Sequence, residues 1–265
     1  MSNKKILITG SGTGLGSYAA LELARRNHIV YATTKYDNEA EKLNKISIDQ
    51  KLPLKAFKLD ILNQGDIDIL KNIDFNVLIN NAAIGDSGSI SEIDINRIKD
   101  VFETNVFGTI NITQATIKKF ISQKYGRIIF VSSLFGRIPY PFLSPYCASK
   151  FSIEAFATCL KKELKKLSNI NIQTAIIEPG AYATGFNKEN NEKKFEWMNK
   201  QSYFKHLIPE IRKKEEKVFN FIEHKNFSTI IKQYIKCVED FKLKSRYTAP
   251  KSQAIFIQLA RILGF

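Results

Sequence analysis

The N-terminal segment constrains the fold of this chain more than any other part of it. A short apolar run, Lys5–Ile8, leads into a glycine-rich segment at residues 9–16, and helical periodicity follows over residues 18–24. Strand, glycine-rich turn and helix in this order present backbone N–H groups at a helix N-terminus, where they can bind a phosphate. The glycines let the backbone approach a pyrophosphate closely, because no Cβ intervenes. The segment therefore predicts a dinucleotide-binding unit.

The spacing of these glycines excludes two other phosphate-binding motifs. The pattern is Thr-Gly-x-x-x-Gly-x-Gly, and the strict G-x-G-x-x-G fingerprint is absent because Leu15 or Ser17 falls at its last position. A P-loop is excluded because no Gly-Lys-Ser or Gly-Lys-Thr follows the turn.

Apolar, strand-like runs recur along the chain between stretches with helical periodicity. They lie at residues 29–33, 54–59, 77–79, 127–131 and 170–177. This alternation predicts βαβ units and a parallel sheet. A chain of 265 residues is long enough to bury both faces of such a sheet in one domain. We therefore predict an α/β fold with a single Rossmann-like, doubly wound parallel sheet and helices on both faces.

A group of polar residues in the middle of the chain has the composition of a proton-transfer site. Tyr146 and Lys150 are four residues apart, so on a helix their polar ends converge on one face. A free tyrosine has a pKa of about 10, and a neighbouring ammonium favours the phenolate and lowers that pKa. A lone Tyr-x-x-x-Lys pair is more often a solvated surface pair, so the assignment depends on Ser133 upstream and on the surrounding motifs.

Six motifs accompany this pair along the chain. They are the turn at 9–16, Asp60-Ile61, Asn80-Asn81-Ala82-Ala83, Thr104-Asn105-Val106-Phe107-Gly108, the segment 126–133 and Pro179-Gly180-Ala181-Tyr182-Ala183-Thr184. In order and spacing they resemble the motifs of the short-chain dehydrogenase/reductase family. Ala83 stands where the family has glycine, a difference that would crowd the cofactor slightly. The segment 135–145 is most similar to the hydroxysteroid and retinol dehydrogenase-like branch, and beyond about Gly185 the resemblance becomes loose.

The resemblance implies an NAD(P)(H)-dependent oxidoreductase that transfers a hydride between nicotinamide and a carbonyl or secondary alcohol. Tyr146 would exchange a proton with the substrate oxygen, and Ser133 would orient that oxygen and stabilise its charge. Lys150 would lower the pKa of Tyr146 and bind the nicotinamide ribose. Asn105 would hold a water molecule that links Lys150 to solvent. No metal is expected.

The cofactor is expected to lie along the glycine-rich turn and the motif residues. The expected cofactor-binding residues are Thr9, Gly10, Gly14, Leu15, Gly16, Thr34, Lys35, Asp60, Ile61, Asn81, Ala82, Tyr146, Lys150, Pro179, Gly180 and Thr184. NADP(H) is predicted over NAD(H), because Thr34 and Lys35 follow the second strand where an NAD-type pocket commonly places a carboxylate. A hydroxyl and a cation suit a 2′-phosphate, although Asp37 lies nearby.

Residues 1–265 are interpreted as one dinucleotide-binding catalytic domain with a substrate-covering segment at about 185–227. That segment is dense in large apolar side chains, which favours an apolar, medium-to-large alcohol or carbonyl substrate over a sugar or short hydroxy acid. These residues are Phe186, Phe195, Trp197, Met198, Tyr203, Phe204, Phe219, Phe221 and Phe227.

Two other classes of function compete with this interpretation. A net charge of +14 is typical of nucleic-acid-binding proteins, but acidic residues interleave the lysine runs and no nucleic-acid motif is present, so no nucleic acid is expected as a partner. A family member that binds cofactor without turnover, as a sensor or scaffold, is the other alternative. The intact set of Asn105, Ser133, Tyr146 and Lys150 argues against it.

The remaining expectations concern location and assembly. The three cysteines have no metal or redox spacing, and no secretory leader is apparent, so a cytoplasmic protein is expected. No apolar run approaches a membrane span, so no stable membrane insertion is expected. Surplus apolar residues at 151–167 favour a homodimer. The apolar tail at 254–265 is expected to pack over the core or the substrate entrance, with shallow membrane contact as the alternative.

Overall fold

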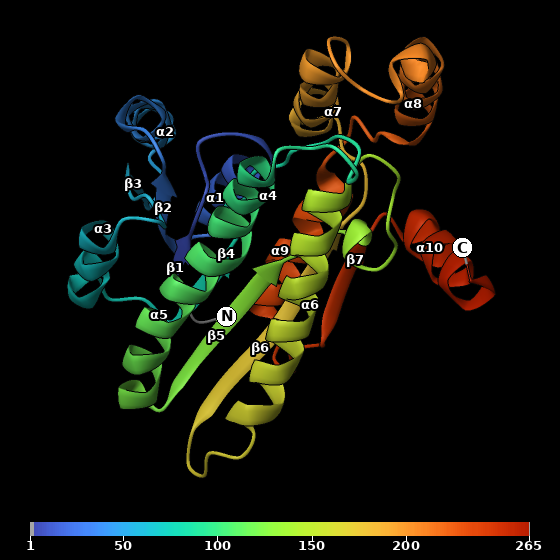
Figure 1. Cartoon of the computed structure of the whole chain (residues 1–265). Coiled ribbons are helices and arrows are strands. Elements are labelled where there is room, and N and C mark those ends of the chain that lie inside the picture. Colours follow the sequence, from blue (N-terminus) through green and yellow to red (C-terminus); the bar gives the residue numbers. More distant parts are fainter. Residues whose placement is uncertain (1–2, 265) are drawn as a thin grey trace.

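The computed structural model describes residues 3–264 and contains a seven-stranded parallel sheet (Figure 1). The strand order is β3-β2-β1-β4-β5-β6-β7, and every neighbouring pair is parallel. The strands are β1 (Lys5–Ile8), β2 (Ile29–Thr34), β3 (Leu54–Lys58), β4 (Val77–Asn80), β5 (Tyr125–Val131), β6 (Asn171–Pro179) and β7 (Arg246–Ala249). The predicted doubly wound α/β fold is confirmed.

Helices cover both faces of the sheet because successive strand side chains point to opposite sides. In β1, Ile6 and Ile8 pack into one buried cluster and Leu7 into the other. The first face carries α1 (Gly14–Arg25), α2 (Asp37–Asp49) and α9 (Ser228–Glu239). The second face carries α3 (Gln64–Asp68), α5 (Thr109–Gln123) and α6 (Ser144–Leu164).

The order of the strands reverses between β1 and β4. The chain runs outward from β1 through β2 to β3, then crosses to the other side of β1 and continues through β4 to β7. In open α/β sheets, ligands bind in the crevice outside the carboxyl ends of the strands at such a reversal. The fold therefore places a crevice next to the turn at residues 9–16.

Two helices stand beyond the carboxyl ends of the strands, at the top of Figure 1. They are α7 (Phe186–Met198) and α8 (Ile208–Ile222), with the short turn Lys205–Leu207 between them. Phe195, Met198 and Ile208 form a small buried cluster of their own between these helices. The buried ion pair between Lys194 and Glu215, at 2.7 Å, also joins α7 to α8.

The remaining elements are α4 (Ile95–Phe102), a π-helical turn over Glu103–Gly108, the short 3-10 turns Ile69–Asn72 and Leu134–Gly136, and the C-terminal helix α10 (Lys251–Leu263). Strand β7 was not predicted, because Arg246–Ala249 is only four residues long and carries no continuous apolar run. Helix α10 contains most of the predicted apolar tail, but Ala260 is its only buried residue among those described. Phe265 lies outside the described residues.

Candidate active site

A cavity of about 630 Å³ lies beyond the carboxyl ends of the strands and collects residues from distant parts of the sequence. Its wall includes most of the predicted site residues, namely Gly10, Gly14, Leu15, Gly16, Lys35, Asp60, Ile61, Asn81, Ala82, Ser133, Tyr146, Lys150, Pro179, Gly180 and Thr184. The structure therefore brings the glycine-rich turn and the proposed proton-transfer residues into one space.

The glycine-rich turn is shaped by positions where a side chain has no room. Gly10 and Gly14 have φ values of +65° and +56°, which favour glycine. A Cβ on Gly16 would lie 2.3 Å from the Gly10 carbonyl oxygen and 2.4 Å from the Asn81 side-chain nitrogen. Because α1 begins at Gly14, its first backbone N–H groups are directed toward the cavity end of the turn, as a phosphate site requires.

Hydrogen bonds tie the turn to the end of β4. The Thr9 hydroxyl oxygen accepts from the backbone N–H groups of Asn81 and Ala82, each at 3.0 Å. The Asn81 side-chain nitrogen donates to the carbonyl oxygens of Thr9 and Gly10, each at 2.9 Å. Thr9 itself is buried and is not part of the cavity wall. Thr9 thus lies beneath the turn, where its hydrogen bonds hold the end of β1 next to the end of β4.

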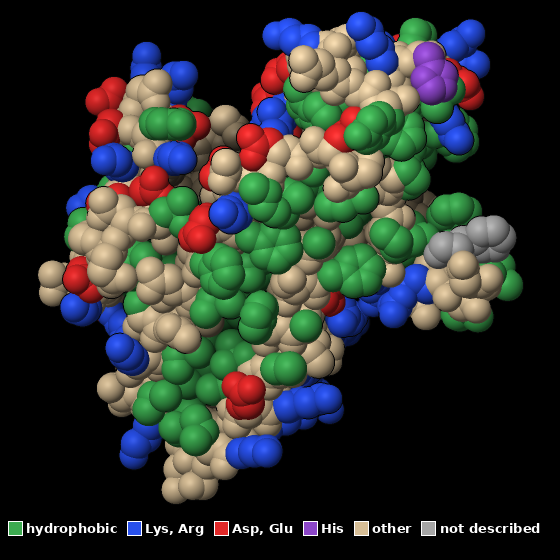
Figure 2. Space-filling view, in the orientation of Figure 1, with side chains coloured by type: hydrophobic (Ala, Val, Ile, Leu, Met, Phe, Trp, Pro, Cys, Tyr) green, Lys and Arg blue, Asp and Glu red, His purple; other side chains and the backbone are tan. Residues whose placement is uncertain are grey.

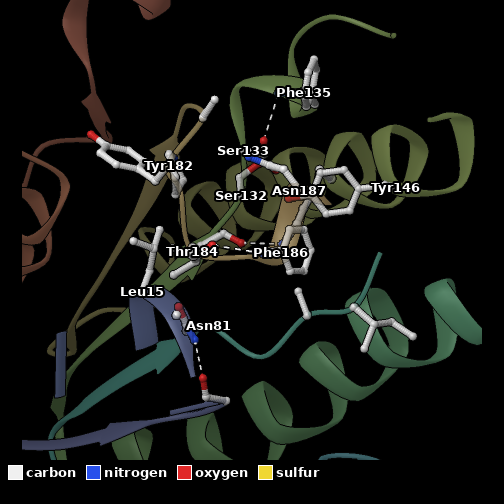
Figure 3. Close-up of a pocket in the computed structure, with 18 of the residues that line it drawn as sticks. Leu15, Asn81, Ser132, Ser133, Phe135, Tyr146, Tyr182, Thr184, Phe186 and Asn187 are labelled. Carbon is white, nitrogen blue, oxygen red and sulfur yellow. Dashed lines mark hydrogen bonds between the residues drawn. The ribbon is translucent and has the colours of Figure 1, made fainter. Parts of the chain in front are cut away.

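Ser133 and Tyr146 approach each other from the end of β5 and the first turn of α6 (Figure 3). The Ser133 hydroxyl oxygen accepts a hydrogen bond from the backbone N–H of Phe135 at 3.1 Å, which fixes the turn after β5. Lys150 is 4% exposed, and its Nζ donates to the Val131 carbonyl oxygen at 2.9 Å. The Phe186 ring lies 5.5 Å from that of Tyr146, between their centroids. The three predicted residues therefore share one end of the cavity.

Burial sets the pKa values of the proton-transfer pair. It raises the pKa of the Tyr146 hydroxyl well above its ordinary value, and the hydrogen bond with Ser133 offsets only part of that rise. It lowers the pKa of Lys150 to about 8, while the charge of Glu154 acts in the opposite direction. In the protein without cofactor, burial therefore dominates the pKa of Tyr146, and an effect of Lys150 on that pKa stays a prediction. The Lys150 ammonium lies 5.7 Å from the Tyr146 ring centroid and is bonded to a backbone carbonyl instead.

Asn105 lies in the π-helical turn and does not reach the cavity wall in the described structure. Its side chain exchanges two hydrogen bonds with the backbone of Ile84, both at 2.8 Å, and donates to the Ser149 hydroxyl at 3.0 Å. These bonds hold the segment after β4 against α6. A π-turn at such a position is common at functional sites.

The two residues predicted to meet a 2′-phosphate are placed differently. Lys35 is exposed and lines the cavity. Thr34 is 1% exposed, and its hydroxyl donates to the Tyr36 carbonyl oxygen at 2.9 Å. Its hydroxyl is therefore occupied within the turn and is not presented to the cavity, because the last residue of β2 points into the protein.

The predicted aromatic segment lines the cavity with only two of its members, Phe186 and Phe219. Phe195 and Met198 form the core between α7 and α8, and Trp197 and Phe204 pack against it. Tyr203 and Phe221 are 79% and 91% exposed. The density of aromatic residues thus mainly reflects packing of the segment itself, which the sequence pattern did not distinguish from a ligand-facing surface.

Leu134, Phe135 and Ile138 are among the apolar residues of the cavity wall that the sequence analysis did not assign to it. Val218 and Ile222 come from the predicted substrate-covering segment, and Phe256 and Ile257 come from the predicted apolar tail. Phe256 and Ile257 belong to α10, so this helix contributes to the cavity wall. Gln253, also on α10, accepts from the Ala181 N–H at 2.9 Å and donates to the Ile222 carbonyl oxygen at 2.7 Å. It joins α10 to the segment after β6 and to α8.

Two further properties of the described residues bear on function. No group of three or more His, Cys, Asp or Glu side chains within residues 3–264 is arranged to hold a metal ion. Over the same residues, no helix has both the length and the apolar character needed to cross a membrane.

Comparisons with known proteins agree with the fold and the motifs. The family model for short chain dehydrogenase matches residues 4–194. An uncharacterised oxidoreductase of Bacillus subtilis strain 168, YusZ, is 34% identical over 190 residues, which cover 69% of this chain and 66% of that protein. A 3-ketodihydrosphingosine reductase of Bacteroides thetaiotaomicron is 30% identical over 200 residues, covering 72% of this chain and 68% of the relative. About a third of each relative therefore lies outside the alignment.

Among solved structures, a short-chain dehydrogenase/reductase from Burkholderia phymatum in complex with NAD superimposes with a TM-score of 0.82. The match covers 98% of this chain and 94% of that chain at 16% sequence identity, so it supports the fold. The family model, in contrast, spans most of the chain and includes every motif of the cavity wall up to Thr184. The chain belongs to the short-chain dehydrogenase/reductase family.

Proposed function

We propose that this protein is an NADP(H)-dependent oxidoreductase acting on a carbonyl compound or the corresponding secondary alcohol. The observation that carries the proposal is the placement of Ser133, Tyr146 and Lys150 at one end of a cavity whose other end is a glycine-rich helix N-terminus. A nucleotide phosphate and a substrate oxygen are thus recognised within one continuous space.

The residues present fit a nicotinamide dinucleotide. The turn at Gly10, Gly14 and Gly16 presents backbone without side chains to the cavity, and the volume of about 630 Å³ suits a ligand of this size class. Lys150, Pro179, Gly180 and Thr184 would hold the nicotinamide end. A bound nicotinamide would supply or accept the hydride.

In the reducing direction, Tyr146 donates its phenolic proton to the substrate oxygen. Because burial raises the pKa of Tyr146, the phenol is protonated at neutral pH, which is the form a proton donor requires. Ser133 donates a hydrogen bond to the same oxygen and stabilises the negative charge that develops there. In the oxidising direction the phenolate would have to form first, and a protonated Lys150 would favour it.

Lys150 is poised to exchange protons with its surroundings. Its pKa of about 8 lies close to neutrality, so the ammonium and the amine are both accessible at physiological pH. We assign to Asn105 the role of positioning residue for this exchange, because it bonds Ser149 and the Ile84 backbone beside α6.

The substrate is proposed to be predominantly apolar. The support comes from the cavity wall near Tyr146, where Phe135, Ile138, Phe186, Phe219 and Ile222 supply large apolar surfaces. Residues 185–227 are proposed as the substrate-covering segment, because α8 contributes Phe219 and Ile222 to the cavity wall. The ketone substrate named for the Bacteroides relative is consistent with this class.

We also propose a homodimer. Phe107, Ile121, Phe151 and Phe156 are between 39% and 55% exposed, and Figure 2 shows apolar side chains gathered along the face of α5 and α6. An exposed band of large apolar residues on paired helices suits an interface between two copies.

A cytoplasmic location remains a prediction, which is based on the cysteine content of the sequence.

The test of the proposed function is Tyr146→Phe, which removes the hydroxyl and keeps the ring. Turnover of an apolar ketone is expected to fall by a factor of about 10² to 10⁴, while cofactor binding, followed by fluorescence titration, is retained. Tyr125→Phe is the matched control, because Tyr125 is 51% exposed at the start of β5 and remote from the cavity wall. Near-normal turnover in Tyr146→Phe would contradict the mechanism, and a protein that binds cofactor but turns over no carbonyl panel would support a sensor or scaffold instead.

A further inference from the structure

Glu39 brings a carboxylate into the dinucleotide cavity at a position that no sequence motif identifies. It lies in the first turn of α2 and lines the cavity wall together with Gly12 and Lys35. Its carboxylate packs directly against the open face of Gly12. A Cβ placed on Gly12 would lie 2.4 Å from Oε2 and 2.7 Å from Oε1 of Glu39. The absence of a side chain at Gly12 therefore makes room for this carboxylate.

This carboxylate has no partner in the described structure. Among residues 3–264, neither a hydrogen bond nor an ion pair reaches the side chain of Glu39, and none joins it to Lys35. Glu39 is half-buried at the cavity wall, so its oxygens are only partly available to water. A partly buried carboxylate gains most from donors that a ligand brings.

The position of Glu39 indicates which part of a dinucleotide it faces. Gly12 lies within the turn at residues 9–16, and Lys35 follows β2, so both belong to the end of the cavity remote from Tyr146. In this fold the residues after the second strand meet the adenosine ribose. Thr34, which occupies the strand-end position, is buried and bonded to Tyr36. The charged side chains after β2 that line the cavity before Asp60 are therefore Lys35 and Glu39, which carry opposite charges.

We propose that Glu39 is a cofactor-specificity residue that opposes Lys35. Its carboxylate accepts hydrogen bonds from the adenosine ribose hydroxyls of NAD(H) and repels the 2′-phosphate of NADP(H), whereas the Lys35 ammonium attracts that phosphate. The inference rests on the proposed function and refines it. With both charges present the protein binds both cofactors, and its preference for NADP(H) is smaller than Lys35 alone would produce.

The experiment is a pair of fluorescence titrations with NADH and NADPH, which give dissociation constants without any turnover. Competition by 5′-AMP and by 2′,5′-ADP, which differ in the 2′-phosphate, isolates the adenosine end. For Glu39→Gln the ratio of Kd(NADH) to Kd(NADPH) is expected to rise by about tenfold. For Lys35→Gln it is expected to fall by a similar factor. Glu41→Gln is the matched control, because Glu41 is exposed on the same helix and outside the cavity wall.

The outcomes separate this inference from the proposed function. A ratio in Glu39→Gln that stays within about twofold of the Glu41→Gln value, or that moves toward NADH, overturns the inference and leaves the oxidoreductase proposal intact. Failure of the wild-type protein to bind either nucleotide overturns both. Glu39→Asp withdraws the carboxylate by one methylene and keeps the charge, so a smaller shift in the same direction is expected there. It provides a second test if circular dichroism shows that Glu39→Gln is not folded.

Discussion

Replacing Lys150 with methionine separates the contribution of this side chain to catalysis from its effect on the free energy of unfolding. The ordinary lysine pKa of 10.5 falls to about 8 because the ammonium is buried. A difference of one in pKa corresponds to about 1.4 kcal/mol, so the charged side chain destabilises the fold by about 3 kcal/mol at neutral pH. Methionine removes that charge at nearly the same length, but it loses the hydrogen bond to the Val131 carbonyl, which is worth about 1 kcal/mol. The variant is therefore expected to be about 2 kcal/mol more stable at pH 7, while turnover is lost.

The pH dependence of this difference follows from the direction of the pKa shift. The folded protein releases the Lys150 proton near pH 8, whereas the unfolded chain keeps it until near 10.5. Between these values the unfolded state binds more protons, so raising the pH stabilises the wild-type fold. The methionine variant lacks this contribution. Its advantage over the wild type is thus expected to shrink by about 2 kcal/mol between pH 7 and pH 10.

The assay is urea unfolding of both proteins at pH 7 and pH 10, with turnover of an apolar ketone measured in parallel. All other titrating groups are common to the two proteins, so they cancel in the difference. Lys165→Met provides the matched control, because Lys165 is exposed just after α6. A Lys150→Met protein that is less stable at pH 7, or whose advantage does not change with pH, would refute the reasoning. Retained turnover would refute the assigned role of Lys150.

Two further predictions test the glycine-rich turn at residues 9–16 and the ion pair that joins α7 to α8. Gly16→Ala is expected to abolish cofactor binding in a fluorescence titration, because its Cβ would lie 2.3 Å from the Gly10 carbonyl oxygen, and binding close to the wild-type value would exclude the proposed cradle. Lys194→Met is expected to destabilise the protein by about 3 kcal/mol in urea unfolding, since Glu215 is left buried without its cation. Combining it with Glu215→Leu should restore most of that loss, and no recovery in the double variant would contradict this explanation.

The sequence predicted those features of the fold that depend on local patterns. The glycine spacing at residues 9–16 and the apolar runs of β1 to β6 are such patterns, because the residues of each one are neighbours in a single turn or strand. The boundaries differ by a few residues at most. Strand β7 was missed because its four residues pair only with the end of β6, and this pairing leaves little trace in the local sequence.

For the site, the order of the motifs predicted which residues come together wherever one motif specifies both the backbone conformation and the reactive side chain, as for Ser133, Tyr146 and Lys150. The tertiary structure decided which side chains face the cavity. It placed the Thr34 hydroxyl in an internal hydrogen bond, most of the aromatic segment in the core between α7 and α8, and two residues of α10 in the cavity wall. It also brought Glu39 against Gly12, a contact between segments 27 residues apart. Orientation and long-range contact depend on how whole elements pack, and so does the burial that raises the pKa of Tyr146 and lowers that of Lys150.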